Sequence, residues 1–447
     1  MNFEKIGLQV PEILLPNPDV DLGKWAVVAC DQYTSQADYW SEIKTVIGTA
    51  PSTLNVIFPE VYLEDGDGQQ RIENINTTMQ QYLDSGVLAP MSNRGFVLVD
   101  RKTSQAPSRK GLVVAIDLEQ YDFNQGSQTL IRATEGTIVD RLPPRIKVRQ
   151  DATIELPHIM VLIDDPQRTV IEPLFEKSPS LLYDFELMME SGHITGYAID
   201  TPELLQSVAD ALTKLASPEL FSKKYSVDSK NTLLYAMGDG NHSLATAKAI
   251  WEKIKADSSD PQSELENPAR YALVELVNIH DEGLQFEPIH RVVFDVKPEQ
   301  LLSDLQEFFA GLKSSSSTIY RCGSEAEMKR RGEAAKGDNT HILPFNDATG
   351  FGYIQIESPE FTLELATLES FLNDYLVKTD GKIDFIHGDD VVNELGAKEG
   401  HMGFFLPPIS KHTLFKTIIF DGALPRKTFS MGEADEKRFY LEARKIK

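Results

Sequence analysis

Cysteine is scarce in this 447-residue sequence: Cys30 and Cys322 are the two that occur, and they do not form a C-x-x-C pair. This argues against a disulfide framework and against a cysteine-rich zinc site. Long apolar runs are missing too, since none approaches the roughly 18 residues of a membrane-spanning helix. The N-terminal stretch MNFEKIGLQVPEILLPNP has prolines and acids where a secretory signal would be apolar. These absences predict a protein of the reducing cytoplasm.

Basic residues are outnumbered, with 44 Lys and Arg against 68 Asp and Glu, for a formal net charge of −24. A surface that neutralises nucleic-acid phosphates needs clustered basic side chains, so this balance argues against nucleic-acid binding as the main function. A pocket for a small anion needs only a few basic residues and stays open. An acidic surface also helps to keep a protein in solution.

Several nucleotide and hydrolase signatures are missing as well. The sequence has no G-x-x-x-x-G-K-[ST] loop, no H-E-x-x-H and no G-x-S-x-G. Its Gly-Asp-Gly at 238–240 lacks the third glycine of a dinucleotide fingerprint. A P-loop nucleotide enzyme is therefore disfavoured.

The length predicts two or three subdomains rather than a single core. The patterning predicts a mixed α/β (α+β) fold class, in which mixed sheets with antiparallel hairpins are surrounded by helices. We expect an N-terminal α/β region (1–170), a central region (171–300) and a C-terminal α+β region (301–447). The expected elements are a helix at 69–85, paired strands at 95–101 and 111–121, a strand at 158–164, mostly helix over 172–223, two strands within 271–296 and a small sheet within 341–367.

The strongest local signal is a turn within LLYAMGDGNHSLATAKAIWEKI, residues 233–254. Residues 233–237 have the length and character of a buried strand, and apolar residues recur at helical spacing from Leu244. Glycines allow the chain to turn sharply between the two. Such a turn directs the free N–H groups of a helix N-terminus at one point, which suits a phosphate or a carboxylate.

The side chains of this turn add chemistry to the backbone. The turn comprises Gly238, Asp239, Gly240, Asn241, His242 and Ser243. Asp239 can hold a divalent cation or orient a hydroxyl, and His242 and Ser243 can donate hydrogen bonds to phosphate oxygens. A helix cap formed by Asp239 or Asn241 is the simpler alternative.

The segment LIRATEGTIVDRLPPRIKVR (130–149) locally reverses the acidic balance, with four arginines within 18 residues. Its polar residues of interest are Arg132, Glu135, Thr137, Arg141, Arg145 and Arg149. Guanidinium groups bind phosphate or carboxylate bidentately. Glu135 among them is either a base or a salt-bridge partner, and a solvated, ion-paired helix remains the simpler interpretation.

Two further stretches carry basic residues of interest. FEPIHRVV (286–293) places His290 and Arg291 at the start of an expected strand. LPRKTFSMGEADEKR (424–438) includes Lys427. A structural histidine and solvated basic residues explain each stretch more simply when it is taken alone.

Together these stretches resemble a bacterial and archaeal family catalogued as the domain of unknown function numbered ten-fifteen. GDGNHSLAT resembles its D-G-H-H-R segment, IRATEGT its R-H-E-x-T segment, EPIHRVV its P-T-H-R segment and LPRKTF its P-R-K-S-T segment. ACDQYTS, with Asp31 and Tyr33, resembles its P-Y-D-V segment. The five segments follow in the family's order through most of the chain.

The sequence also departs from the family's motifs. Asn241-His242-Ser243 stands where the family has His-His-Arg, so that one imidazole and one guanidinium are lost. The R-H-E segment lacks its histidine, and Asp31 and Tyr33 are reversed and separated relative to Tyr-Asp. These changes indicate a divergent branch whose substrate need not match that of its relatives.

Members of the family are linked to ATP-dependent phosphorylation of free serine. Their D-G-H-H-R element is similar to the phosphate-binding element of ParB- and sulfiredoxin-like proteins, which include free-serine kinases. The resemblance thus implies a kinase that uses ATP and Mg²⁺ and phosphorylates a free amino acid, foremost L-serine to O-phospho-L-serine.

The resemblance also implies roles for individual residues. The catalytic residues would be Asp239, which would also hold the metal, Glu135 as base, and His242. The nucleotide would be bound by Gly238, Gly240, Asn241, Ser243, Arg132 and Arg145. The substrate would be bound by Thr137, His290, Arg291, Lys427, Asp31 and Tyr33.

Two other functions stay open. One is a different phosphate-handling enzyme, either a phosphoester hydrolase or a ligase, which would use the same turn. The other is a non-catalytic nucleotide-binding regulator, which the altered His-His-Arg segment would suit. The expected partners are a small-molecule substrate and a nucleotide, without nucleic acid or membrane, and assembly as a homodimer is left open.

Overall fold

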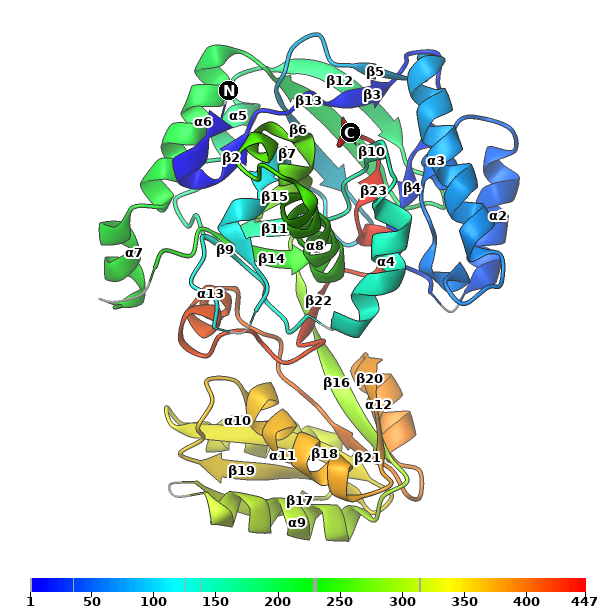
Figure 1. Ribbon diagram of the computed structural model, residues 1–447. Helices are drawn as coiled ribbons and strands as arrows, with labels where there is room; N and C mark the ends of the chain where they lie inside the picture. Colours follow the sequence, from blue (N-terminus) through cyan, green and yellow to red (C-terminus); the bar gives the residue numbers. More distant parts are fainter. Residues whose placement is uncertain (1, 35, 125, 138, 228–230, 313–314) are drawn as a thin grey trace. The chain divides into compact units, whose positions relative to one another are not determined.

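The computed structural model describes residues 2–447 apart from 35, 125, 138, 228–230 and 313–314, and the chain divides into two compact units (Figure 1). The larger unit comprises Met1–Gln285 and Met431–Lys447, and the smaller comprises Phe286–Ser430. The smaller unit is therefore an insertion into the chain of the larger one. These boundaries differ from the expected breaks after residues 170 and 300, because a single sheet takes strands from both of the first two expected regions.

Eleven of the described strands form the mixed sheet of the larger unit. In spatial order the path is β12 (Ser180–Glu186), β13 (His193–Ile199), β6 (Phe96–Lys102), β7 (Arg109–Asp117), β15 (Tyr271–Asn278), β11 (Met160–Ile163), β14 (Tyr235–Asp239), β9 (Ile131–Arg132) and β8 (Tyr121–Asp122). Off this path, β2 (Leu8–Gln9) pairs with β7 and with β1 (Asn2–Phe3). The sheet is mixed because β11 runs parallel to β15 and antiparallel to β14.

Both faces of this sheet are buried, as the alternation along β7 illustrates. Leu112 and Val114 pack into one hydrophobic core and Val113 into the other. The first core includes apolar residues of α6 and α8, and the second includes those of α2 and α3. The helices of the larger unit are α1 (Leu22–Trp25), α2 (Ala37–Ile47), α3 (Gly68–Asp84), α4 (Leu142–Arg149), α5 (Glu172–Phe175), α6 (Pro202–Leu215), α7 (Pro218–Tyr225) and α8 (Asn241–Asp257).

The C-terminal segment returns to complete the second core. Leu441 and Ala443 are fully buried there. Two short antiparallel strand pairs hold this segment, and a third two-stranded pair, which does not include it, lies elsewhere in the larger unit. These pairs are β23 (Phe439–Tyr440) with β4 (Val27–Val28), β24 (Arg444–Lys445) with β10 (Ile154–Glu155), and β3 (Leu14–Pro16) with β5 (Leu88–Pro90).

The smaller unit has its own sheet and its own hydrophobic core, which includes Phe345, Ile354 and Leu368. Its strand order is β17 (Ser316–Cys322), β19 (Gly350–Glu357), β18 (Thr340–Asp347), β21 (Met402–Phe404), β16 (Phe286–Phe294) and β20 (Lys382–His387). Its helices are α9 (Pro298–Gly311), α10 (Glu325–Ala335), α11 (Glu364–Lys378), α12 (Asp389–Gly396) and α13 (Lys411–Phe420). The short strand β22 (Phe429–Met431) leads the chain back.

The expected fold class, mixed α/β with antiparallel hairpins, is confirmed. The expectation of mostly helix over 172–223 is wrong, because β12 and β13 form an antiparallel hairpin within it. Residues 187–192 connect the two strands, and Met189, Glu190 and Gly192 among them have positive φ values of 55°, 54° and 87°. The expected sheet within 341–367 is correct for β18 and β19, but its last segment begins α11 instead.

Candidate active site

The turn between β14 and α8 has the expected strand–turn–helix form. Gly240 lies between them with φ 80°, a conformation that residues with a side chain seldom adopt. A Cβ atom at this position would lie 3.1 Å from the Cα of Ile159, a tight contact that also favours glycine. The helix N-cap is Gly240 itself and no side chain caps the helix, so the capping role considered for Asp239 or Asn241 is not seen.

Asp239 ends β14 with its carboxylate held by two donors. Its Oδ2 lies 3.1 Å from Lys437 Nζ, and its Oδ1 accepts the N–H of Gly240 at 2.9 Å. Burial opposes ionisation, but Lys437 outweighs it and holds the pKa of Asp239 below its usual value. The carboxylate is therefore charged at neutral pH and lies beside the first turn of α8.

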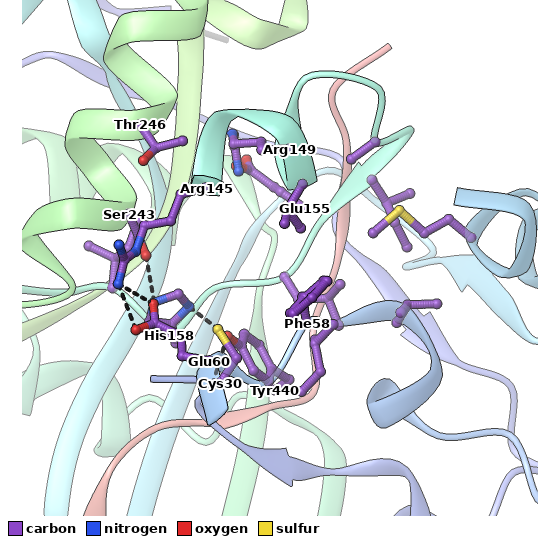
Figure 2. A pocket seen from close by; sticks show the side chains of 18 of the residues that line it. Cys30, Phe58, Glu60, Arg145, Arg149, Glu155, His158, Ser243, Thr246 and Tyr440 are labelled. Carbon is purple, nitrogen blue, oxygen red and sulfur yellow. Dashed lines mark hydrogen bonds and ion pairs between the residues drawn. The ribbon is translucent and has the colours of Figure 1, made fainter. Parts of the chain in front are cut away.

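A cavity of about 140 Å³ opens beside this first turn (Figure 2). Ser243 and Thr246 line it from α8, and Arg145 and Arg149 line it from α4, which packs against α8. Its other polar lining residues are Cys30, Glu60, Glu155, His158 and Tyr440. Its apolar wall is formed by Val56, Ile57, Phe58, Leu63, Met79, Val148, Ala152, Ile154, Leu156, Ile159 and Leu273.

The most polar contact in the cavity joins Arg145 to Glu60. Arg145 Nη2 lies 2.5 Å and 2.6 Å from the two carboxylate oxygens of Glu60. Burial raises the pKa of Glu60, Arg145 lowers it, and Asp31 nearby raises it again, so that the net shift is upward. This carboxyl group thus accepts a proton more readily than an exposed glutamate.

His158 is the centre of a second set of contacts. Its Nε2 lies 2.8 Å from Ser243 Oγ, and its Nδ1 lies 2.8 Å from the hydroxyl of Tyr440. Asp31 Oδ2 lies 4.0 Å from the same Nε2. His158 therefore links α8 to the returning C-terminal segment, with Asp31 nearby.

Two arginines of the Arg-rich segment, Arg132 and Arg145, are predicted to bind the nucleotide. In the described part of the chain, Arg145 lines this cavity and Arg132 does not. Arg132 is buried and donates to the carbonyl oxygens of Thr129 at 2.8 Å and Asn231 at 2.7 Å. Burial lowers the pKa of Arg132 to about 10. This geometry gives Arg132 a structural role in its own loop.

The remaining predicted residues of the larger unit lie around these elements. Glu135 and Thr137 are half-buried in the segment before α4. His242 is half-buried in α8, where its carbonyl accepts the hydroxyl of Thr246 at 2.7 Å. Tyr33 has φ 50° and stacks on Tyr39 with 3.7 Å between ring centroids.

Three predicted substrate residues belong to the smaller unit, and their partners there are structural. The guanidinium of Arg291 is fully buried, with Nε 2.7 Å from Glu369 Oε1. His290 Nδ1 accepts the N–H of Leu406 at 3.0 Å, and its Nε2 lies 3.0 Å from an Asp389 oxygen. Lys427 Nζ lies 5.8 Å from the ring centroid of Phe385.

Sequence reasoning missed several residues that the structure brings to the cavity or to Asp239. These are Glu60, His158, Lys437, Tyr440 and Cys30. Cys30 lies within ACDQYTS and Lys437 within LPRKTFSMGEADEKR, but neither residue was singled out there, and all five lie far along the chain from the turn. A weak signal was available for His158, because it is one of nine histidines and precedes a buried strand.

The donor set is compatible with Mg²⁺ bound together with a phosphorylated ligand. Within the described residues no three His, Cys, Asp or Glu side chains form a metal-binding group. Mg²⁺ in nucleotide sites is commonly held by one or two carboxylates plus phosphate oxygens and water, so a complete protein cage is not needed. Asp239 is a charged carboxylate beside the first turn of α8, but it is not one of the residues that line the cavity.

No helix in the described part of the chain combines the length and apolarity needed to cross a membrane.

A sequence model of the family described as "Protein of unknown function (DUF1015)" matches residues 12–368. No curated protein matches the chain. Among solved structures, a free serine kinase in complex with AMP is similar at 10% identity and a TM-score of 0.38, over 75% of this chain and 92% of that chain. A conserved hypothetical protein from Pyrococcus furiosus is similar at 9% identity and 0.35, over 74% and 90%. SbnI from Staphylococcus aureus, truncated at its C-terminus, is similar at 8% identity and 0.34, over 72% and 82%.

Proposed function

The chain belongs to the DUF1015 family, and we propose that it is an ATP-dependent kinase that phosphorylates the hydroxyl of a free amino acid, L-serine foremost. The observation that carries the proposal is the meeting of Arg145 from α4 and Ser243 from the first turn of α8 at one cavity. Phosphoryl transfer needs an anion site, positive charge and a base close together. The motif resemblance supplies the reaction class, and these residues supply the groups.

The anion site combines backbone and side-chain donors. Gly240 starts α8 without a side-chain cap, so the N–H groups of the first turn are directed toward an incoming anion. Ser243 adds a hydroxyl from α8, and Arg145 adds a guanidinium from α4. The apolar wall beside them suits the body of the ligand, and for ATP this is the purine.

Asp239 is the residue that would hold Mg²⁺, which neutralises phosphate charge when it is bound. Asp239 is ionised because of Lys437, and this favours binding of a cation. Lys437 itself adds positive charge close to the first turn of α8.

The base is a carboxylate. In the proposed step the acceptor oxygen bonds to the γ-phosphorus, the bond from that phosphorus to the bridging oxygen breaks, ADP leaves, and the hydroxyl proton passes to the carboxylate. Glu135 is the sequence-based choice. Glu60 is a second choice, because it lines the cavity and its pKa is raised toward the range of an effective base.

The first test measures ADP release from Mg-ATP by the purified chain, across a panel of hydroxy amino acids, with ³¹P NMR of the product. Serine-dependent ADP with a phosphoserine signal supports the kinase. D239N should reduce turnover at least 100-fold, as loss of a metal-holding group does, while the matched control D184N, at an exposed carboxylate beside His193, should not.

The same assay separates the alternatives. ADP release that needs no acceptor would indicate a hydrolase, and ATP binding without turnover under all conditions would indicate a regulator. Either result overturns the kinase. E135Q and E60Q then identify the base, since only the true base loses activity with its fold intact.

A further inference from the structure

Ser243 stands where the family's motif has arginine, and its hydroxyl meets an imidazole from outside the motif. Ser243 Oγ lies 2.8 Å from His158 Nε2, and both residues line the cavity (Figure 2). A serine beside a histidine has two different uses. It is a nucleophile if the imidazole accepts its proton, and it is a hydrogen-bond donor to an anion if the imidazole donates to it.

Tyr440 decides between these uses because it sets the tautomer of His158. The Tyr440 oxygen accepts the N–H of Cys30 at 3.2 Å and lies 2.8 Å from His158 Nδ1. Burial raises the pKa of this phenol well above its usual value, so it keeps its proton. The Cys30 sulfur, also close to the hydroxyl, is a weak acceptor, whereas an imidazole nitrogen is a good one. The phenol proton therefore lies between Tyr440 and Nδ1.

With Nδ1 accepting, the ring proton of the neutral imidazole is on Nε2. This N–H donates to Ser243 Oγ, so the proton of the Ser243 hydroxyl is free to point at a ligand in the cavity. Asp31, 4.0 Å from Nε2, favours a proton on that nitrogen as well. Chains of hydrogen bonds polarise one another, which makes the last donor stronger.

We propose that Ser243 is a hydrogen-bond donor to a phosphate oxyanion, and that His158 is the positioning residue that holds it in this role through Tyr440. The identity of the phosphate ligand rests on the proposed function, whereas the direction of the bonds does not. In this tautomer His158 cannot take the proton of Ser243, so His158 does not act as a base that makes Ser243 a nucleophile. Ser243, His158 and Arg145 together take the place of the imidazole and guanidinium that the motif has lost.

The test measures binding of inorganic phosphate and of ADP to the full chain by calorimetry. H158M removes the bond that orients the Ser243 hydroxyl, and we expect phosphate binding to weaken by about 2- to 13-fold, the contribution of one neutral hydrogen bond. H158Q keeps an N–H near the Nε2 position and should recover part of the loss. H193Q is the matched control, since His193 lies at the surface between Asp184 and Glu186.

The readout that a structural role would not move is the ¹⁵N spectrum of His158. The wild type should show a protonated Nε2 and an unprotonated Nδ1, and Y440F should shift the imidazole toward a mixture of tautomers. Phosphate binding to H158M at wild-type strength, a proton on Nδ1 in the wild type, or a phosphorylated Ser243 trapped with ATP would each overturn the proposal.

Different experimental results would refute the proposed role of His158 and the proposed kinase activity. If no acceptor gives ADP release while phosphate affinity still depends on His158, the kinase is overturned and the role of His158 stands. If serine-dependent ADP release is unchanged in H158M, the role of His158 is overturned and the kinase stands.

Discussion

Replacing the buried Arg438 by methionine should destabilise the larger unit strongly. Arg438 is 4% exposed and forms ion pairs with Glu275 and Glu442, which are 1% and 0% exposed. Glu442 also accepts the hydroxyl of Tyr183 at 2.5 Å. Removing one partner of a buried ion pair typically costs about 3–5 kcal/mol, because it leaves an uncompensated charge in the interior. Here two carboxylates lose their shared partner, so the upper part of that range is expected.

The assay can follow the larger unit alone. The three tryptophans of the chain, Trp25, Trp40 and Trp251, are all buried in that unit, so tryptophan fluorescence during thermal unfolding reports on it. For a unit of this size, 3–5 kcal/mol corresponds to a midpoint lowered by roughly 6–10 °C. Such a shift is large enough to measure without a full two-state analysis.

Two further variants define the cause. R71M removes an exposed ion pair with Asp67, and the midpoint should change little, since exposed pairs contribute about 1 kcal/mol or less. Adding E275Q and E442Q to R438M should restore part of the lost stability, because the unpaired charges are gone. A midpoint lowered by less than about 2 °C in R438M, or no recovery in the triple variant, would refute the reasoning.

Two other outcomes are expected at the turn before α8. K437M should move the acid limb of the pH profile for kcat/KM to higher pH. Lys437 keeps the pKa of Asp239 low, so without Lys437 the carboxylate is protonated at a higher pH. An acid limb at the same pH as in the wild type would show that Asp239 does not take part in the catalytic step. G240A should lower the unfolding midpoint of the larger unit by more than G86A does. Both glycines have positive φ, which costs a residue with a side chain about 1–2 kcal/mol, but only at Gly240 would the new Cβ also approach Ile159. Equal shifts of the midpoint would show that space at Gly240 is not limiting.

The local part of the site was accessible from the sequence. The turn before α8 depends on glycines, an apolar strand and helical periodicity that are contiguous in the chain, and the structure has all three. Arg145 was selected by its type and its neighbours, and it lines the cavity. Arg132 was selected for the same reason, yet its Nε and Nη2 donate to carbonyl oxygens of its own loop and of a distant segment, which no spacing rule reveals.

The other part of the site depends on tertiary structure. Glu60, His158 and Tyr440 come from three distant segments, and none carries a local pattern that distinguishes it from other residues of its type. The same limit explains the missed hairpin of β12 and β13. Leucine spacing typical of helix was correct for α6, but the apolar residues before it belong to half-exposed strands, of which β13 also pairs with the distant strand β6.

The path of the chain has a consequence for its synthesis. Because Met431–Lys447 belong to the larger unit, the ribosome must release the whole inserted unit before the second core can close. Until then Glu275, Val27 and Val28 lack Arg438 and the strand Phe439–Tyr440 that cover them in the folded protein. The nascent chain therefore carries a buried charge without its counter-ion and an unpaired strand edge for the time needed to make about 145 residues, which at 5–20 residues per second is roughly 7–30 s. During that interval the larger unit exposes apolar surface and an unpaired strand edge, which are the features that make incompletely folded chains prone to aggregate.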